Sequence, residues 1–341
     1  MAKKVVTFGE IMLRLSPPGY QRFVQAGSFD VVYGGGEANV AVSLAGFGLD
    51  SYFVTRVPRH EIGQSAVNHL RRFGVRTDYI VRGGSRLGIY FLEMGASQRP
   101  SKVIYDRANS SISEISQGEI DWGRVFEGAD WFHFTGITPA LGDRAAAATL
   151  EAARTAKEMG LTVSADLNYR KNLWTPEKAR EVMTGLMKYV DVVVANEEDA
   201  DKVFGIRAER TDVTRGEIDS AAYRDVAAKL VEMFGFDKVA ITLRESISAF
   251  DNIWSGMLFD GSEHLFSKKY PVHIVDRVGG GDAFAAGLIH GILSGKSSRD
   301  ALEFAVAASC IKHSIFGDFN LVTVDEVEAL AKGDTSGRVQ R

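Results

Sequence analysis

The sequence predicts an α/β protein built on a doubly wound, mainly parallel sheet flanked by helices, with a small β-sheet attached as a lid. From about residue 130 onward, short β-rich apolar runs alternate with amphipathic helical stretches. These runs are too apolar to alternate between polar and apolar residues, which is typical of strands covered on both faces. The first hundred residues instead contain extended segments in hairpin-like settings.

The small sheet is expected near the N-terminus. Extended segments are predicted at 23–33, 88–95 and 102–106. Long loops that carry such a sheet often close over ligands, so we expect a lid formed by about 12–33 and 86–107. An edge extension of the main sheet is the alternative interpretation.

The main sheet and its helices are expected in the rest of the chain, and residues 1–332 are expected to form one domain. The predicted strands are 131–134, 161–165, 190–194 and 238–242, and the predicted helices are 144–159, 176–188 and 221–234. Thr175 followed by Pro176 supplies an N-cap and a first helical residue. The polar segment 207–219 is expected to be a surface loop, and 333–341 a flexible tail.

Length and composition restrict the classes of function. The 341 residues are 45% hydrophobic and 25% charged with a net charge of -4, which offers no basic footprint for nucleic acid. The N-terminus carries no long apolar signal segment and no stretch approaches a membrane span, so a cytoplasmic protein without a membrane partner is expected. The single cysteine, Cys310, excludes an internal disulfide and a cysteine-based zinc site. A small-molecule partner fits better.

The most informative segment is 276–287, where a glycine run opens directly into an apolar helical sequence. The backbone N–H groups of Gly279, Gly280 and Gly281 can converge on an anion, and the following helix adds its positive end. Asp282, in the first turn, is expected to be held ionised by the same groups and so to act as a general base. Such a base beside an anion cradle is what phosphoryl transfer to an alcohol requires. A tight turn with an aspartate cap is an equally weighted alternative for this segment alone.

A second glycine cluster begins at Gly34 and Gly35 and also precedes an apolar helix. Bare backbone there permits close approach of a polyhydroxylated ligand, and Asn39, one turn into the helix, offers a donor and an acceptor. The pattern suits a sugar. A hairpin end that leads into a helix, with Asn39 exposed, is the alternative.

Together the two clusters resemble the paired signatures of the ribokinase-like (PfkB) carbohydrate kinases, Gly-Gly-x-x-x-Asn-x-Ala near the start and Asp-x-x-Gly-Ala-Gly-Asp near the end. The resemblance spans nearly the whole chain, from Gly9 to the helix around 305–313. It implies a ribokinase-like fold, ATP and Mg²⁺ as cofactors, an anion hole in the second signature and Asp282 as the catalytic base. Arg277 stands where threonine is usual and Gly280 where alanine is usual. The positive charge of Arg277 disfavours a monovalent-cation site nearby. The sequence therefore does not decide whether the protein requires such a cation.

Two stretches, 9–17 and 166–174, restrict the candidate substrates, because they look like the corresponding stretches of 2-keto-3-deoxygluconate kinases. That substrate bears a carboxylate. By the same resemblance Tyr90, Tyr105 and Arg107 correspond to contacts with an acidic sugar, and Arg170 reaches the substrate or the transferring phosphate. Phosphorylation at a terminal hydroxyl is expected. A fructokinase, another PfkB sugar kinase, or a non-catalytic sugar-binding regulator of the same fold are the alternatives.

The nucleotide side is also assigned by resemblance. The family's Asn-x-x-Glu element appears as Asn196 to Asp199, and the shorter carboxylate of Asp199 would act on magnesium through water. Thr242 and Arg244 end a core strand that resembles the adenosine-binding stretch, and Asn320 is a candidate wall of the adenine pocket. Lid sheets in this family often pair between subunits, so the resemblance implies a homo-oligomer.

Two other nucleotide-binding motifs are excluded. The segment 291–297 has only three residues between its glycines, whereas a P-loop needs four, and it ends a helix instead of opening one. No Gly-x-Gly-x-x-Gly follows the first strand, which disfavours a Rossmann dehydrogenase.

Overall fold

The computed structural model describes residues 2–196, 198–206 and 220–335. The predicted surface loop 207–219 and residues 336–341 of the predicted tail lie outside the described residues. Within the described ranges, none of the helices is both long and apolar enough to cross a membrane.

The main sheet has nine strands in the order β14-β13-β12-β11-β10-β9-β1-β4, with β15 paired to β13. Its neighbours from β12 to β4 are parallel, and β13 pairs antiparallel with β12, β14 and β15. The strands are β1 (Lys4–Phe8), β4 (Asp50–Val54), β9 (Trp131–Thr135), β10 (Thr162–Asp166), β11 (Val192–Ala195), β12 (Lys238–Ser246), β13 (Asp251–Phe259), β14 (His264–Phe266) and β15 (Tyr270–His273). The predicted mainly parallel sheet is confirmed.

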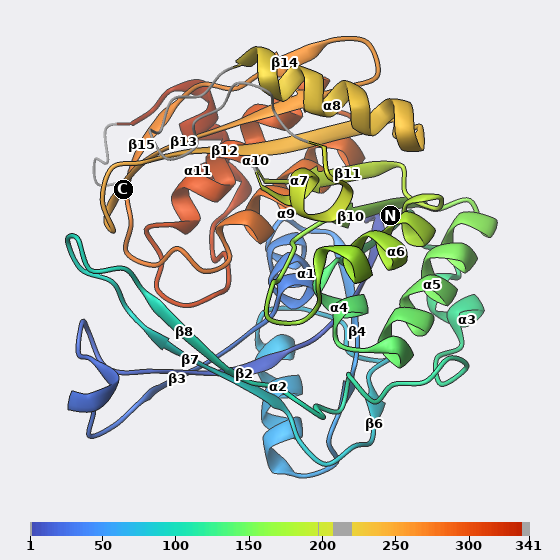
Figure 1. The fold of residues 1–341 in the computed structure, drawn as a ribbon, viewed down its shortest axis with the longest axis vertical. Helices are drawn as coiled ribbons and strands as arrows, with labels where there is room; N and C mark the ends of the chain where they lie inside the picture. The colour runs from blue at the N-terminus through green and yellow to red at the C-terminus, as the bar shows by residue number, and fades with distance from the viewer. Residues whose placement is uncertain (1, 197, 207–219, 336–341) are drawn as a thin grey trace.

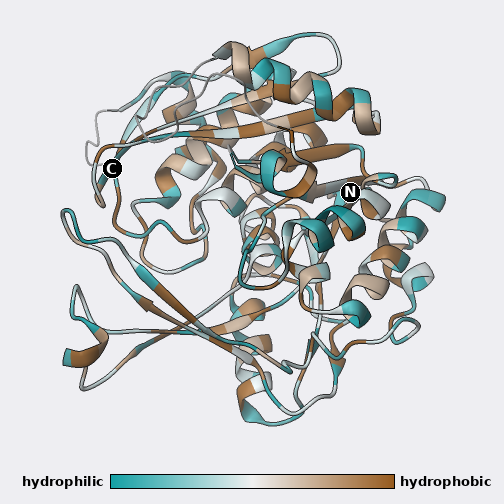
Figure 2. Ribbon diagram, in the orientation of Figure 1, coloured by the Kyte–Doolittle hydropathy of each residue, from teal (hydrophilic) through white to brown (hydrophobic). Residues whose placement is uncertain are grey.

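Helices cover both faces of this sheet (Figure 1). Along β11, Val193 packs in the core beneath α5, α6 and α8, whereas its neighbours Val192 and Val194 pack with α1, α9 and α10. Figure 2 shows hydrophobic strands between helices whose outer sides are hydrophilic. The helices are α1 (Gly36–Gly46), α2 (Glu61–Arg72), α3 (Trp122–Phe126), α4 (Ile137–Ala140), α5 (Asp143–Glu158), α6 (Pro176–Met187), α7 (Asp199–Phe204), α8 (Ser220–Phe234), α9 (Gly280–Leu293), α10 (Ser298–Lys312) and α11 (Val324–Lys332).

Local sequence signals set most element boundaries. The Thr175 side chain accepts a hydrogen bond from the Lys178 N–H at 3.3 Å and Pro176 opens α6, as expected from their order. Strand β12 runs to Ser246, four residues beyond the predicted end. The reason is its antiparallel pairing with β13, which continues to the pair Ser246 and Asn252.

The small sheet is separate from the main sheet and lies at the lower left of Figure 1. Its order is β3-β2-β7-β8, formed by β2 (Met12–Ser16), β3 (Asp30–Gly34), β7 (Gly88–Glu93) and β8 (Lys102–Asp106). The prediction of an extended run from residue 23 was wrong at its start, because Phe23–Gln25 forms a 3₁₀ turn whose Phe23 N–H donates to the Glu93 carboxylate at 2.9 Å. A third, two-stranded sheet joins β5 (Arg56–Val57) to β6 (Val81–Arg82). Closure of the small sheet over a ligand stays a prediction.

Helix α9, which begins within the glycine run, is fixed by close packing against α10. A Cβ atom added at Gly287 would lie 2.7 Å from the Cα atom of Ala305, and one added at Gly291 would lie 2.8 Å from the Cα atom of Ala301. Because real Cβ atoms do not approach a backbone so closely, only glycine fits at these two positions. The packing therefore fixes where the N-terminus of α9 meets the sheet.

We expect Gly287→Ala to lower the free energy of unfolding by about 1–3 kcal/mol, the usual cost of overpacking a core. Urea-induced unfolding measures the change. The matched control is Gly185→Ala in α6, where an added Cβ meets no atom within 4 Å. That variant should be as stable as the wild type or more stable by about 0.5–1 kcal/mol, because alanine is the better helix former. A Gly287→Ala protein as stable as the wild type would contradict the packing argument.

Candidate active site

A cavity of about 520 Å³ lies between the small sheet and the main sheet. Residues at the carboxyl ends of β10 and β11, and Thr242 within β12, contribute to its wall. Parallel α/β sheets bind ligands at this edge. Residues of β7 and β8 face the cavity from the small sheet, and the glycine run at the start of α9 forms a further part of the wall.

Most of the predicted site residues line this one cavity. They are Gly35, Asn39, Tyr90, Tyr105, Arg107, Arg170, Asn196, Asp199, Thr242, Arg244, Gly279, Gly280, Gly281 and Asp282. Gly34 and Asn320 are not in the wall. A Cβ atom added at Gly34 would lie 2.0 Å from Asp318 Oδ2, so its backbone approaches a carboxylate of the protein itself. Asn320 is 3% exposed. Their predicted ligand contacts stay predictions.

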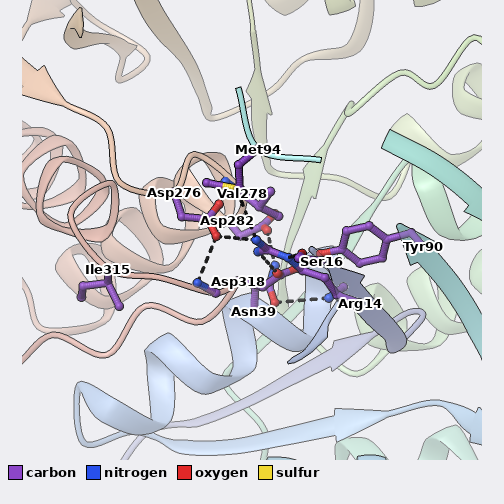
Figure 3. A network of polar contacts seen from close by, with 12 residues as sticks. Arg14, Ser16, Asn39, Tyr90, Met94, Asp276, Val278, Asp282, Ile315 and Asp318 are labelled. Atoms are coloured by element: carbon purple, nitrogen blue, oxygen red, sulfur yellow. Dashed lines mark hydrogen bonds and ion pairs between the residues drawn. The ribbon is translucent and has the colours of Figure 1, made fainter. Parts of the chain in front are cut away.

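The two glycine clusters meet at Asp282 (Figure 3). Asp282 lies in the first turn of α9, and its Oδ2 accepts a hydrogen bond from Asn39 Nδ2 at 2.7 Å. Asn39 Oδ1 accepts in turn from the Gly35 N–H at 3.2 Å. Segments separated by 243 residues are thus joined through one amide. Asn39 orients the carboxylate, a contact that the sequence alone did not indicate.

The protonation of Asp282 is governed by burial more than by the N–H groups that the sequence pointed to. Burial raises the pKa of Asp282 to about 6, although the hydrogen bond from Asn39 lowers it. The Asp318 carboxylate raises the pKa further, and the Arg170 and Lys312 charges lower it. At neutral pH the carboxylate is mostly ionised, and it is a stronger base than an ordinary aspartate.

The three glycines before Asp282 have different surroundings. Gly279 has a left-handed φ of 84°, and an added Cβ would lie 2.0 Å from the Asp318 carbonyl oxygen. A Cβ at Gly280 would lie 2.6 Å from the His313 ring, whereas one at Gly281 would meet no atom within 4 Å. The first two glycines therefore pack on the segment that follows α10. Gly281 leaves room for a ligand at the N-terminus of the helix.

Arg107 lies at the end of β8 under the small sheet and is 7% exposed. Its guanidinium pairs with Glu10, and Ser110 donates to the same carboxylate at 2.8 Å. It also stands 5.2 Å from the centre of the Tyr105 ring. The Arg107 Nε atom is buried, and no acceptor in the described part of the chain contacts it. The guanidinium is thus held in place by Glu10, and Arg107 lines the cavity.

Tyr90 lies opposite Tyr105 in the pairing of β7 with β8. Its hydroxyl donates a hydrogen bond to Asp318, whose other oxygen accepts from Arg14 at 2.9 Å. The phenol is therefore already engaged, and burial raises its pKa well above the ordinary value. Tyr90 presents its ring to the cavity, whereas Tyr105 is the more exposed of the two phenols.

Two further carboxylates face Arg170 in the cavity. Asp199 accepts hydrogen bonds from the N–H groups of Tyr169 at 3.1 Å and Asn196 at 3.2 Å, which ties together the loops after β10 and β11. Asp166, at the end of β10, was not assigned a role from the sequence. Burial raises the pKa of both aspartates, and the Arg170 charge opposes that shift. The signal that could have identified Asp166 is a carboxylate at the carboxyl end of a predicted buried strand.

Within the described ranges, no group of three or more His, Cys, Asp or Glu side chains is arranged to hold a metal ion. Asp166 and Asp199 nevertheless both line the cavity with raised pKa values, which a cation nearby would offset. Magnesium retains several of its waters, so two carboxylates suffice for a water-mediated contact.

Comparison with known proteins supports this picture. A model of the pfkB family carbohydrate kinases matches residues 2–318. The chain belongs to this family. As a carbohydrate kinase, it is similar to a 2-dehydro-3-deoxygluconokinase from Thermotoga maritima, with 56% identity and a TM-score of 0.94 over 97% of this chain and 100% of that one.

Other relatives of the kinase also match over their full length. A PfkB family carbohydrate kinase from Listeria grayi is 36% identical, with a TM-score of 0.89 over 97% of this chain and 100% of that one. A 2-dehydro-3-deoxygalactonokinase from Haloferax volcanii is 33% identical over 337 residues, 99% of each chain. The family and fold inferred from the two glycine signatures are confirmed.

We expect kcat/KM to fall as the pH drops through about 6, because Asp282 must be deprotonated to accept a proton. Asn39→Leu removes the hydrogen bond that lowers this pKa, so the acidic limb should move to higher pH. Steady-state kinetics across the range from about pH 5 to about pH 9 locate the limb in both proteins.

The control for this measurement is Asn68→Leu, because Asn68 is exposed on α2 and bonds only to Gln64 among the described residues. It should leave the limb in place. An acidic limb that stays fixed or moves to lower pH in Asn39→Leu would contradict the assignment of that limb to Asp282.

Proposed function

We propose that this kinase transfers the γ-phosphoryl group of ATP to a terminal hydroxyl of 2-dehydro-3-deoxygluconate, also called 2-keto-3-deoxygluconate. The observation that carries the proposal is the arrangement around Asp282. A buried carboxylate at a helix N-terminus, oriented by Asn39, shares one cavity with a held guanidinium at Arg107. That combination suits proton abstraction from an alcohol on a sugar that bears a carboxylate.

In this mechanism Asp282 accepts the proton of the attacking hydroxyl as its oxygen bonds to the γ-phosphorus, while the bond from that phosphorus to the β,γ-bridging oxygen breaks and ADP leaves. The open space at Gly281, at the N-terminus of α9, takes the transferring group, whose oxygens gather negative charge. Arg170 adds a positive charge at the same wall. Asp166 and Asp199 would hold magnesium through water, and the ion would neutralise charge on the phosphates. Thr242 and Arg244, which line the same cavity, would contact the adenosine.

The substrate assignment rests on Arg107. Its positive charge at the cavity wall and its position beside Tyr105 fit a carboxylate and would add little for a neutral sugar. The names of the relatives point to the same class, since one acts on 2-dehydro-3-deoxygluconate and another on its galactonate counterpart. These two sugar acids differ only in configuration, so both belong in any substrate panel.

The test is ADP release with ATP and magnesium across both sugar acids, fructose and ribose, for the wild type and Asp282→Asn. We expect selective turnover of a keto sugar acid. Asp282→Asn should lose turnover by ~10²–10⁴-fold, the usual contribution of a general base, while nucleotide binding by calorimetry persists. Turnover of fructose alone would favour a fructokinase, and tight sugar binding without turnover in the wild type would favour a sugar-binding regulator. Asp282→Asn with wild-type turnover would exclude the base assignment.

Arg107→Lys tests the acidic-sugar contact while keeping a charge beside Glu10. We expect KM for the keto acid to rise by ~10-fold or more, the loss of one hydrogen bond to a charged group, with a smaller change in kcat. KM for a neutral sugar should not change. Arg99→Lys, in the connection between β7 and β8, is the control, because this arginine pairs with Glu93. An unchanged KM for the keto acid in Arg107→Lys would remove the carboxylate role.

We also propose that copies of the chain associate through the small sheet. Val31 on β3 and Ile104 on β8 are apolar and exposed, by 59% and 54%. Exposed apolar side chains gathered on one sheet are typical of an interface. Sedimentation of the purified protein measures the association, and a strictly monomeric protein would exclude it.

A further inference from the structure

Lys312, the last residue of α10, has no part in the mechanism above, yet its side chain is entirely buried. Lysine is almost never fully buried unless its charge is paired. The side chain ends beneath the glycine run, where a Cβ atom added at Gly279 would lie 3.3 Å from Lys312 Cε. A buried charge thus lies directly against the loop that carries Asp282.

The Lys312 ammonium is held by backbone oxygens. It donates to the carbonyls of Gly317 at 2.7 Å, Ile315 at 3.1 Å and Asp276 at 3.3 Å. An ammonium has three N–H donors and a neutral amine has two, so three acceptors match the charged form. No carboxylate in the described ranges lies within ion-pair distance of Lys312. Asp276 and Asp318 instead pair with Arg14.

These three carbonyls belong to the two segments that bracket the catalytic loop (Figure 3). Asp276 begins the glycine-rich segment, and its side chain accepts from the Gly317 N–H at 3.0 Å. The Asp276 C=O and the Arg277 N–H belong to one planar peptide unit and point in opposite directions. Fixing the carbonyl therefore also fixes the direction of that N–H. The ammonium therefore sets the backbone at the entry to the anion cradle.

The charge balance at the loop supports the same role. Burial lowers the pKa of Lys312, whereas the Asp276 and Asp318 carboxylates raise it. Burial raises the pKa of Asp282, and the Lys312 charge is among the groups that lower it. Positive potential beneath the cradle favours the charge that develops on a transferring phosphoryl group.

Backbone carbonyls converging on one positive charge resemble the coordination that proteins offer to a free monovalent cation. Here that position is filled by a covalently attached ammonium. Arg277, the residue whose charge raised the question of a cation, donates to the Ala249 carbonyl at 3.1 Å instead.

We propose that the Lys312 ammonium is a tethered monovalent cation. It occupies a carbonyl cage that suits a free potassium or ammonium ion, positions the glycine loop, and makes turnover independent of any dissolved monovalent cation. The proposal rests on the kinase reaction proposed above. Lys312 acts through the loop and is a positioning residue.

The test compares turnover in a choline buffer with turnover after addition of potassium, ammonium or methylammonium. Wild-type kcat should be the same in all four. Lys312→Ala vacates the cage, and its kcat in choline should fall by ~10²-fold, comparable to the loss of one preorganised charge-stabilising donor. The small cations should restore much of that loss, whereas choline is too large to enter. The KM for the sugar should change far less than kcat.

Lys312→Met distinguishes loss of the charge from loss of the side chain's volume, because methionine fills the cage without a charge. It should show the same loss in kcat and no restoration by any cation. Lys296→Ala is the control, since Lys296 is a partly buried lysine that pairs with Glu328 beyond the other end of α9. Its kcat should match that of the wild type in every buffer.

Thermal unfolding supplies a readout that does not depend on activity. Potassium or ammonium should raise the melting temperature of Lys312→Ala and leave those of the wild type and Lys312→Met unchanged, because only the vacated cage binds the ion. A folded Lys312→Ala that no cation stabilises or reactivates overturns the proposal, as does a wild type that potassium activates. If Lys312→Ala does not fold, Lys312→Met decides, and wild-type kcat in that variant overturns the proposal.

Failure of the proposed function gives a different result. A wild type that phosphorylates no sugar in any buffer refutes the kinase proposal, and the cation effect on melting temperature still tests the cage. Normal wild-type turnover combined with an unrescued Lys312→Ala refutes the cation role alone.

Discussion

The architecture of the site depends on one buried guanidinium. Arg14, on β2 of the small sheet, is completely buried and pairs with Asp276 at 2.7 Å and with Asp318 at 2.9 Å (Figure 3). Removing one partner of such a buried pair typically costs about 3–5 kcal/mol, because the remaining charge is left without compensation in a poorly solvated place. The two carboxylates come from the segments on either side of α9 and α10. A single side chain thus joins the small sheet to the segments before α9 and after α10.

Asp318 shows how far this constraint extends. Its carboxylate accepts hydrogen bonds from both Arg14 and Tyr90. Strands β2 and β7 of the small sheet are therefore tied to one residue that follows α10. The same residue limits the space at Gly34 through its side chain and at Gly279 through its carbonyl. A side chain at Gly34 or at Gly279 would clash with Asp318, so this residue is one reason why both clusters contain glycine. The ligand cavity is bounded by parts whose spacing is set by these contacts.

The sequence was sufficient for the layers and for the two glycine clusters, because both depend on local patterns. Apolar runs of strand length predicted β9 to β12, and glycine next to an apolar helix predicted the loop before Asp282. The roles of Arg14 and Lys312 could not be predicted, since their partners lie on other elements or depend on how a helix end packs. The raised pKa of Asp282 could not be predicted from the sequence either, because it is caused mainly by burial, which is a property of the folded chain.

The distance along the chain between Arg14 and Asp318 also bears on how the protein is made. The two residues are 304 positions apart, so Arg14 leaves the ribosome long before its carboxylate partners are synthesised. A nascent chain that ends before Asp276 has neither of them, and its small sheet has no charge against which to dock. Domains generally fold from the N-terminus as they emerge, but here the first strands cannot complete these ion pairs until Asp276 and Asp318 have been synthesised. A truncated product is therefore left with an undocked sheet, a state that protein quality control can recognise.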